Sequence, residues 1–356
     1  MSKKIKTRKE HYRFWRNIKI TIFVILILIL IPIQFPTQYY LEGLGNANSL
    51  SPVISVDGKR DQRLGEFMYT DVSILGPINL FVMGVTLFYP HATIVDRRSL
   101  MSDQSNEEYN RLQDYYMEDA ENTAISTAFK KAGEKVETQY LGVYVMSIDS
   151  KSQFKKKLKI GDTITKVDDQ NITTSDEFRS YLSKKKAGQK VKIEVNRDGR
   201  KMSVTGALVN LTKKRAGVGI IPVDHTKVVT DKKVHFNMGD VGGPSAGLMF
   251  TLELYSLLTD KDLRHGHRIA GTGTIEKDGT VGPIGGIEKK IVSADKAGAS
   301  YFIAPDDPVT KEIKRDDPNY VNNYQLAREA KKRFNLKIKI IPVKTFDDAL
   351  KALENL

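Results

Sequence analysis

Three glycine-rich segments in the C-terminal part of this 356-residue chain contain side chains suited to hydrolytic chemistry. The first reads Gly-Gly-Pro-Ser-Ala-Gly over 242–247 and leads into apolar residues at helical spacing over 248–258. Ser245 is therefore expected in the first turn of a helix, where unpaired N–H groups and the helix dipole stabilise an oxyanion. If Ser245 is a nucleophile, the loop residues around the oxyanion are Gly243, Pro244 and Ala246. The alternative from this segment alone is that Ser245 only caps the helix.

The second segment supplies a base. Residues 285–291 read Gly-Gly-Ile-Glu-Lys-Lys-Ile and predict a helix that runs to about Ala297 and ends at Gly298. Lys290 lies at the edge of the apolar stripe of this helix, whereas Lys289 points elsewhere. A lysine that is partly removed from water has a lowered pKa and can act as a neutral base. The alternative is an ordinary solvated lysine on a helix face.

The third segment joins the other two and offers a hydroxyl group. Residues 269–275 predict a Gly- and Thr-rich strand, which a turn at 277–279 returns to residues 281–284. A threonine hydroxyl at this position can hydrogen-bond the amine of the lysine and orient it. His235 lies on the strand before the serine loop and keeps a Ser–His pair open as an alternative, although no partner motif accompanies it.

Taken together, the three segments resemble the proteolytic domain of the Lon family. The matching strings are Gly-Pro-Ser-Ala-Gly at 243–247, Thr-Gly-x-Ile at 272–275, and Pro-Ile-Gly-Gly-x-x-x-Lys at 283–290. The resemblance implies Ser245 as the nucleophile, Lys290 as the general base, and Thr272 as a hydroxyl that supports the lysine. It also implies an α+β proteolytic domain over 215–356 and a Ser–Lys dyad that needs no cofactor, metal or nucleotide.

The departures from that family are also informative. No Gly-x-x-x-x-Gly-Lys-Ser/Thr phosphate-binding loop occurs in the sequence, so we expect no nucleotide partner and no ATP-driven unfolding of substrates. Substrates would then be peptides or unfolded protein segments. Many Lon sequences have Asp three residues before the serine; this chain has Gly242 there, with Asp240 nearby. Lon rings suggest a homo-oligomer, by analogy alone.

Residues 131–210 resemble a PDZ domain. The match to the apolar-Gly-apolar loop by which that family holds a peptide carboxylate is made by Leu141, Gly142, Val143 and Tyr144. Residues 158–169 match the mid-domain signature of the family. The expected elements are a helix over 175–185 and strands over 190–196 and 201–208, turned by Asp198-Gly199. The resemblance implies that an extended peptide binds as an added strand; the alternative is a small α+β spacer.

The N-terminal residues predict a membrane segment. Residues 1–16 form a basic tail, and the first 19 residues hold eight Lys and Arg against one Glu, a net +7 of the chain's +13. An apolar core over 20–33 follows, flanked by Trp15 and Tyr39, so a transmembrane signal anchor is expected over 17–40. The positive-inside rule then places the N-terminus in the cytoplasm and the catalytic part outside the cell. A cleaved signal peptide and a buried core helix are the alternatives.

Residues 41–130 lie between the expected anchor and the PDZ-like unit. Short β-like runs over 50–98 predict an extracellular β-rich segment that can pack on the proteolytic domain. Polar residues over 99–131, with apolar or small residues spaced among them, predict a solvent-exposed helical connector.

The amino-acid composition excludes several classes of active site. The sequence has no cysteine, which excludes disulfides, thiolate nucleophiles and Cys-ligated zinc, and its six histidines show no H-E-x-x-H zinc motif. Nucleic-acid binding is not expected, because more than half of the net positive charge lies in the N-terminal tail. The order of segments resembles the membrane-anchored PDZ–Lon-like proteases of Gram-positive bacteria. We therefore expect a single-pass, ATP-independent serine endopeptidase of the α+β class; the rival is a non-catalytic PDZ-bearing membrane adaptor.

Overall fold

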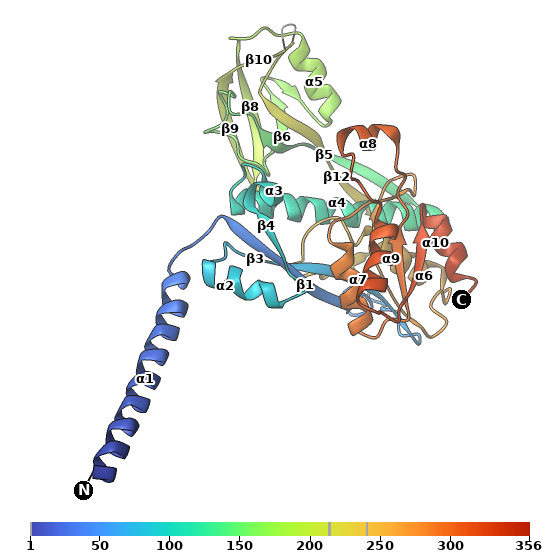
Figure 1. Ribbon diagram of the computed structural model, residues 1–356. Helices are drawn as coiled ribbons and strands as arrows, with labels where there is room; N and C mark the ends of the chain where they lie inside the picture. The colour runs from blue at the N-terminus through green and yellow to red at the C-terminus, as the bar shows by residue number, and fades with distance from the viewer. Residues whose placement is uncertain (1, 213–214, 240) are drawn as a thin grey trace. The chain divides into compact units, whose positions relative to one another are not determined.

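The computed structural model describes residues 2–212, 215–239 and 241–356 (Figure 1). The chain divides into two compact units. The first holds the residues up to Leu44 together with Val72–Asp103, and the second holds Gly45–Asp71 together with Gln104–Leu356. Helices and strands both contribute throughout, which confirms the mixed α+β class that the sequence predicts.

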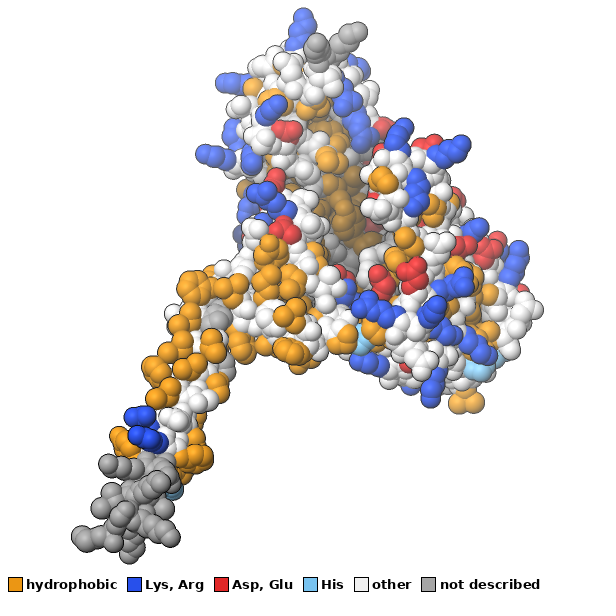
Figure 2. Space-filling model, in the orientation of Figure 1, with side chains coloured by type: hydrophobic (Ala, Val, Ile, Leu, Met, Phe, Trp, Pro, Cys, Tyr) orange, Lys and Arg blue, Asp and Glu red, His pale blue; other side chains and the backbone are white. Residues whose placement is uncertain are grey.

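The first unit is built on one antiparallel strand pair. Strand β1 (Tyr39–Ser49) starts here and pairs through residues 39–42 with β4 (Thr93–Asp96). The other elements of this unit are α1 (Ser2–Ile33), α2 (Leu80–Val85), the 3-10 helix η1 (Thr86–Phe88) and α3 (Arg97–Met101). Figure 2 shows apolar side chains on the part of α1 that is coloured, which includes the exposed residues from Ile20 to Leu28.

The expected transmembrane anchor over 17–40 is not found. Within the part of the chain that the structure describes, no helix combines the length and the apolar character needed to cross a membrane. The predicted span also ends differently, since α1 stops at Ile33 and Tyr39 already belongs to strand β1.

One part of the second unit is organised on a parallel sheet. Strands β3, β14, β17 and β18 follow one another in that sheet, and each pairs in parallel with its neighbour. Their bounds are β3 (Glu66–Leu75), β14 (Arg268–Gly271), β17 (Tyr301–Pro305) and β18 (Lys339–Val343). Strand β3 comes from the β-rich segment before the PDZ-like unit, so that segment supplies a strand to the parallel sheet.

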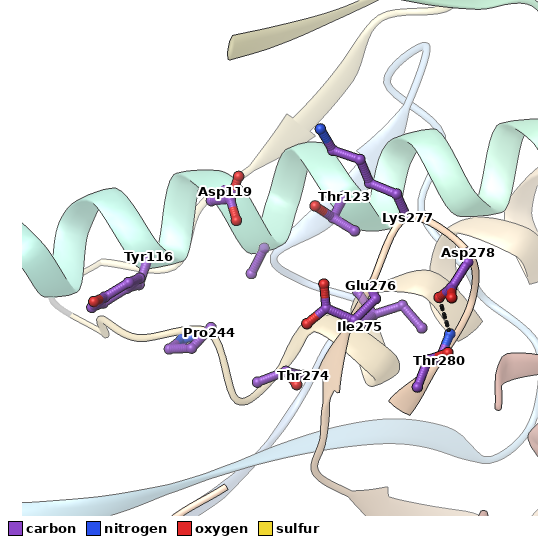
Figure 3. Close-up of a pocket in the computed structure, with 11 residues that line it drawn as sticks. Tyr116, Asp119, Thr123, Pro244, Thr274, Ile275, Glu276, Lys277, Asp278 and Thr280 are labelled. Carbon is purple, nitrogen blue, oxygen red and sulfur yellow. Dashed lines mark hydrogen bonds between the residues drawn. The ribbon is translucent and has the colours of Figure 1, made fainter. Parts of the chain in front are cut away.

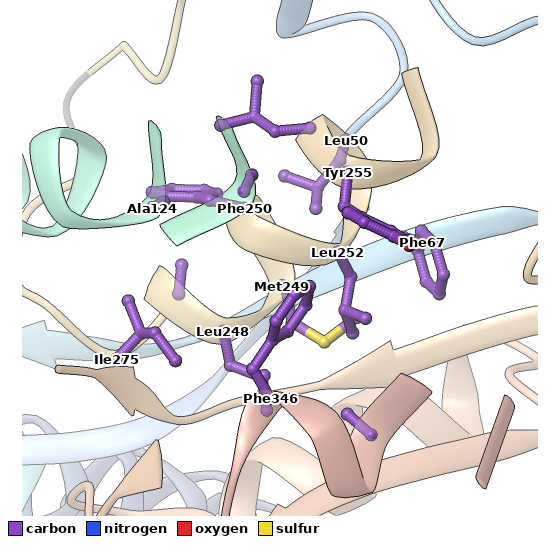
Figure 4. Packing of buried hydrophobic residues seen from close by; sticks show 14 of the residues in the cluster. Leu50, Phe67, Ala124, Leu248, Met249, Phe250, Leu252, Tyr255, Ile275 and Phe346 are labelled. Atoms are coloured by element: carbon purple, nitrogen blue, oxygen red, sulfur yellow. The ribbon is translucent and has the colours of Figure 1, made fainter. Parts of the chain in front are cut away.

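Alternate residues of these strands face two different cores, as the pleat of a strand requires. Ile269 and Ile303 belong to one apolar cluster, while their neighbours Ala270 and Phe302 belong to another. The first cluster surrounds α6, whose buried side chains are seen in Figure 4. Every residue of that helix from Gly247 to Ser256 is buried, because the helix is apolar on almost all sides. This helix follows the serine loop directly.

Short elements and further helices complete this part of the second unit. The helices are α6 (Gly247–Thr259), α7 (Ile287–Lys296), α8 (Lys311–Asp316), α9 (Asn323–Arg333) and α10 (Phe346–Leu353). The short strands pair as β2 (Ile54–Val56) with β13 (Val234–Phe236) and β15 (Thr274–Ile275) with β16 (Val281–Gly282). The turn between β15 and β16 is the one expected at 277–279.

The PDZ-like part forms a separate antiparallel sheet with the strand order β12-β5-β6-β8-β9. Its elements are β5 (Val136–Ile148), β6 (Thr163–Val167), β7 (Gln170–Asn171), α5 (Ser175–Ser183), β8 (Lys190–Arg197), β9 (Arg200–Ala207), β10 (Val209–Thr212), β11 (Arg215–Gly217) and β12 (Ile220–Thr230). Asp198 and Gly199 both have positive φ, 51° and 78°, as a two-residue hairpin turn between twisted strands requires. Strand β12, which the sequence groups with the catalytic domain, pairs with β5 in this sheet.

Helix α4 (Asn106–Ala132) lies between these two parts. It begins at a capping box made by Ser105 and Glu108 and ends at Gly133 with φ 76°. The sequence predicts a helical connector here, and the helix is confirmed, but its expected exposure to solvent is wrong. Nine of its residues are buried, because the helix packs on α6 along one side and on β5 and β12 along another. Small residues such as Ala124 and Ala128 allow this close approach.

Candidate active site

The three side chains that the sequence singles out meet at one point. The Nζ atom of Lys290 lies 2.6 Å from the Oγ atom of Ser245 and 3.2 Å from the Oγ1 atom of Thr272. The Thr272 hydroxyl donates in turn to the backbone carbonyl of Ser245, at 3.0 Å. Lys290 is 3 % exposed and Thr272 is fully buried, while Ser245 is half-buried. A buried amine in contact with a reachable hydroxyl is the arrangement of a nucleophile and its base.

Ser245 does not lie in the first turn of α6, as expected, but just before the helix. The helix begins at Gly247, and its N-cap residue is Ala246, which makes no side-chain capping bond. The side chain of Ser245 instead contacts Lys290, so the capping alternative does not describe its role in this structure. The backbone of Ser245 is fixed because its carbonyl accepts from the N–H of Gly273, at 2.8 Å, as well as from Thr272.

Lys290 is placed by the first turn of α7. Gly286, the N-cap residue with φ 69°, lets the chain turn sharply into the helix and accepts the backbone N–H of Lys290. Ile287, Ile291 and Ala294 of the same helix pack in an apolar cluster beside Phe302. The solvated-lysine alternative is therefore excluded by the position of the side chain.

The predicted oxyanion loop has fewer donors than expected. The N–H of Gly243 already donates to the carbonyl of Gln113 in α4, at 3.0 Å, and Pro244 has no N–H to offer. The N–H groups of Ser245 and Ala246 donate to no other group among the described residues. The remaining donors for an oxyanion are thus those of Ser245 and Ala246. Gly243 has φ 91°, so its role is conformational: it bends the loop around α4.

The sequence also singles out an acid and a histidine, Asp240 and His235, before the serine. Asp240, noted in the sequence as the acid nearest to the loop, lies outside the described residues. His235 is exposed on β13, where it pairs with Ser55 of β2. The base in contact with Ser245 is Lys290, so the geometry does not favour the Ser–His alternative.

A cavity of about 650 Å³ adjoins the serine loop (Figure 3). Pro244 lines it beside Tyr116, Asp119 and Thr123 of α4. The opposite wall consists of Thr274, Ile275, Glu276, Lys277, Asp278 and Thr280. Sequence reasoning missed the part played by α4, because the polar residues that line this cavity look like those of an ordinary solvated helix face.

The predicted peptide-binding edge of the PDZ-like unit is not open. Leu141, Gly142, Val143 and Tyr144 do lie in strand β5, as the resemblance implies. Their outer neighbour, however, is strand β12 of the same chain, which pairs antiparallel with β5 along its whole length. Gly142, Val143 and Tyr144 are paired with β12, so in this structure they form part of an internal strand and not an exposed edge for a peptide.

Comparison with known proteins identifies two domains. A PDZ domain model matches residues 123–208, and the model of the Lon protease (S16) C-terminal proteolytic domain matches residues 183–353. The chain therefore has a PDZ domain and a Lon-type proteolytic domain.

Lon proteases of other bacteria are similar to part of this chain. Lon protease 2 of Myxococcus xanthus is 39 % identical over 111 residues, which are 31 % of this chain and 13 % of that protein. Lon protease of Fusobacterium nucleatum is 30 % identical over 163 residues, which are 42 % of this chain and 19 % of that protein. This chain thus spans less than a fifth of the length of these Lon proteases. Among solved structures, the PDZ domain of the SdrC-like protein from Listeria monocytogenes is 34 % identical, with a TM-score of 0.23, over 24 % of this chain and 90 % of that one.

Proposed function

We propose that this chain is an ATP-independent serine endopeptidase in which Ser245 is the nucleophile and Lys290 the general base. The observation that carries the proposal is the 2.6 Å contact between the Lys290 amine and the Ser245 hydroxyl in a site where the lysine is 3 % exposed. The Thr272 hydroxyl lies within reach of the same amine and orients it. These three residues are sufficient for acyl transfer without any metal or nucleotide.

The first half of the reaction forms an acyl-enzyme. The neutral amine of Lys290 takes the hydroxyl proton of Ser245 while Oγ attacks the carbonyl carbon of the scissile peptide bond. The negative charge that develops on the carbonyl oxygen is stabilised by the N–H groups of Ser245 and Ala246. As the tetrahedral intermediate collapses, the C–N bond breaks and the ammonium of Lys290 gives its proton to the leaving amine.

The second half of the reaction restores the free enzyme. A water molecule enters where the amine has left and loses a proton to the again neutral Lys290. The hydroxide attacks the ester carbonyl, and the same two N–H groups stabilise the second oxyanion. Release of the acid then returns the proton from Lys290 to the Oγ atom of Ser245. Thr272, held by the backbone carbonyl of Ser245, keeps the amine aimed at Oγ in both halves.

The substrates would be peptides or unfolded segments of proteins. The cavity beside Pro244 is wide, open to solvent and lined by polar side chains together with Tyr116 and Ile275, which fits side chains of an extended polypeptide. The sequence contains no phosphate-binding loop with which to drive unfolding by ATP. Folded proteins would therefore be cleaved only at segments that are already exposed.

The N-terminal segment would hold the peptidase at a cell membrane with the catalytic part outside the cell. Support comes from the exposed apolar side chains between Ile20 and Leu28 of α1 and from the basic residues Arg13, Arg16 and Lys19 that precede them. Fractionation of cells that express the full chain, and a version lacking residues 1–38, tests this proposal. Recovery of both versions in the same soluble fraction would refute it.

Mass spectrometry of peptide digests tests the catalytic proposal. The full chain is incubated with a mixture of unstructured peptides, with a chelator and without ATP, beside Ser245→Ala and Lys290→Met variants. Lys296→Met is the matched control, because Lys296 lies on the same helix but is exposed. We expect fragments from the parent and from the control only. Cleavage by Lys290→Met at the parent's rate would show that another group acts as the base.

A further inference from the structure

The groove by which a PDZ domain takes up an extended peptide is filled here by the chain itself. Strand β12 runs antiparallel to β5, with Ile220 opposite Ile148 and Asp224 opposite Val143, and continues to Thr230 opposite Val136. A peptide that adds to the edge of β5 would have to make the same backbone hydrogen bonds. The edge has no place for a second strand while β12 occupies it.

The other wall of the groove, helix α5, also binds β12. The side chain of Asp224 accepts the backbone N–H of Ser175 at the start of α5, at 2.7 Å. The guanidinium of Arg179 donates to the carbonyl of Pro222, at 3.0 Å. Ile220 packs on the apolar cluster that contains side chains of α5 and β5. Strand β12 is therefore held from both sides, as a bound peptide would be.

The conformation of Gly142 agrees with an internal role for this edge. Its φ is 138°, and a Cβ at this position would lie 2.4 Å from the carbonyl oxygen of Ile164 in β6. Close packing of β5 on β6 is a sufficient reason for glycine here. Strand β12 passes Gly142 at His225 and continues beyond it, so the place of a terminal carboxylate is taken by continuous chain.

The filled groove is tied to the serine loop through α4. The ring of Tyr115 stacks on Tyr144 of β5 at 4.1 Å, and its hydroxyl donates to the carbonyl of Asp224 in β12. Two residues earlier, the carbonyl of Gln113 accepts the N–H of Gly243 in the loop before Ser245. One turn of α4 thus touches both the occupied groove and the catalytic loop.

We propose that β12 is a built-in ligand of the PDZ-like groove, so that this unit supports α4 and the serine loop instead of delivering substrate peptides. The proposal rests on the proposed peptidase function for its consequence, whereas the occupancy of the groove can be measured without any cleavage. Substrates then reach Ser245 directly, through the cavity beside Pro244.

An engineered disulfide between β5 and β12 tests whether β12 occupies the groove in solution. The chain has no cysteine, so Ser147→Cys with Ile221→Cys, which are register partners, gives a unique pair in the full chain. Ile221 is 59 % exposed, so an oxidant can reach it. The matched control is Lys192→Cys with Thr205→Cys, register partners on β8 and β9 away from the groove.

Three results are expected. Both pairs oxidise completely with no peptide present, at similar rates. A large excess of unstructured peptides with free carboxyl termini leaves the oxidation rate of the Ser147→Cys/Ile221→Cys pair unchanged. The oxidised form cleaves those peptides with the kcat/KM of its reduced form.

Opposite results would overturn the proposal. Failure of the groove pair to oxidise while the control pair does would mean that β12 does not occupy the groove in solution. Slower oxidation in the presence of peptide would mean that peptides displace β12. A drop of tenfold or more in kcat/KM on oxidation, restored by reductant, would mean that substrates enter through the groove. If neither the parent nor the variants cleave any peptide, the peptidase proposal fails, and the two oxidation measurements still decide the occupancy of the groove.

Discussion

Replacing Thr272 by Val tests whether its hydroxyl orients the lysine. Thr272 is fully buried, and its Oγ1 lies 3.2 Å from Lys290 Nζ and 3.0 Å from the carbonyl oxygen of Ser245. Valine keeps nearly the same shape but removes the hydroxyl. The carbonyl of Ser245 still accepts from the N–H of Gly273, so no buried backbone group is left without a partner. The change therefore acts mainly on the amine of Lys290.

The expected loss of activity follows from the bond that is removed. The amine becomes an ammonium during the reaction, and a hydrogen bond to a charged group contributes about 1.5–3 kcal/mol. At about 1.4 kcal/mol for each factor of ten, Thr272→Val should lower kcat by about 10- to 150-fold. KM should change little, because Thr272 is buried beneath the serine and does not line the cavity. Thr272→Ser keeps the hydroxyl and should retain most of the activity.

Steady-state cleavage of a fluorogenic peptide, measured for the parent, Thr272→Val and Thr272→Ser, checks this prediction. Thermal unfolding of all three proteins controls for a general loss of structure. A Thr272→Val protein that is folded and has the parent's kcat would refute the orienting role. An equal loss in Thr272→Val and Thr272→Ser would also refute it, because packing rather than the hydroxyl would then be the cause.

Three further predictions concern the occupied groove, the serine loop and the buried helix α6. Tyr115→Phe removes the hydroxyl that donates to the carbonyl of Asp224. It should lower the free energy of unfolding by about 1 kcal/mol. Denaturant titration measures this, and an unchanged midpoint would contradict the prediction. Gly243→Ala places a side chain at φ 91°, with its Cβ 2.9 Å from Oε1 of Gln113. The strained loop should lower kcat by about tenfold or more. A variant with the parent's kcat would contradict this prediction. Burial raises the pKa of Glu253 from 4.5 to about 7, so the folded chain keeps a proton that the unfolded chain releases. The stability that this group contributes is full below about 4.5 and is lost as the pH rises through about 7. Glu253→Gln should therefore gain thermal stability relative to the parent as the pH rises from 5 to 8, and a constant difference in Tm would argue against it.

The parts of the site that could be predicted from sequence are those with a local signal. The serine and lysine segments each combine glycines with the start of an apolar helical pattern, and α6 and α7 do begin there. The limits of α7 and the turn at Asp198-Gly199 follow from residues that stand next to each other in the chain. In each case the interaction that fixes the structure spans only a few residues.

The features that escaped prediction depend on contacts between distant residues. Strand β12 pairs with β5, about 80 residues earlier in the chain, and nothing in its own sequence distinguishes it from a strand of the catalytic domain. Residues of α4 that the sequence predicts to be exposed are buried, because α6 covers one side of the helix and β5 and β12 cover another. Each partner covers only part of the helix surface. The carbonyl of Ser245, just before the helix, accepts hydrogen bonds from Gly273 and Thr272, which lie on a different segment of the chain.

The two sides of the serine loop are held by different parts of the second unit. The backbone of Ser245 is bound to Gly273 and Thr272, which belong to the proteolytic core, and α6 behind it is buried on almost all sides. The N–H of Gly243, two residues earlier, is bound to α4, which in turn depends on the PDZ-like unit. Substitutions in the PDZ-like unit should therefore alter the serine loop and the cavity wall before they alter the contact between Lys290 and Ser245. Substrate preference and catalytic chemistry can thus vary separately in this fold.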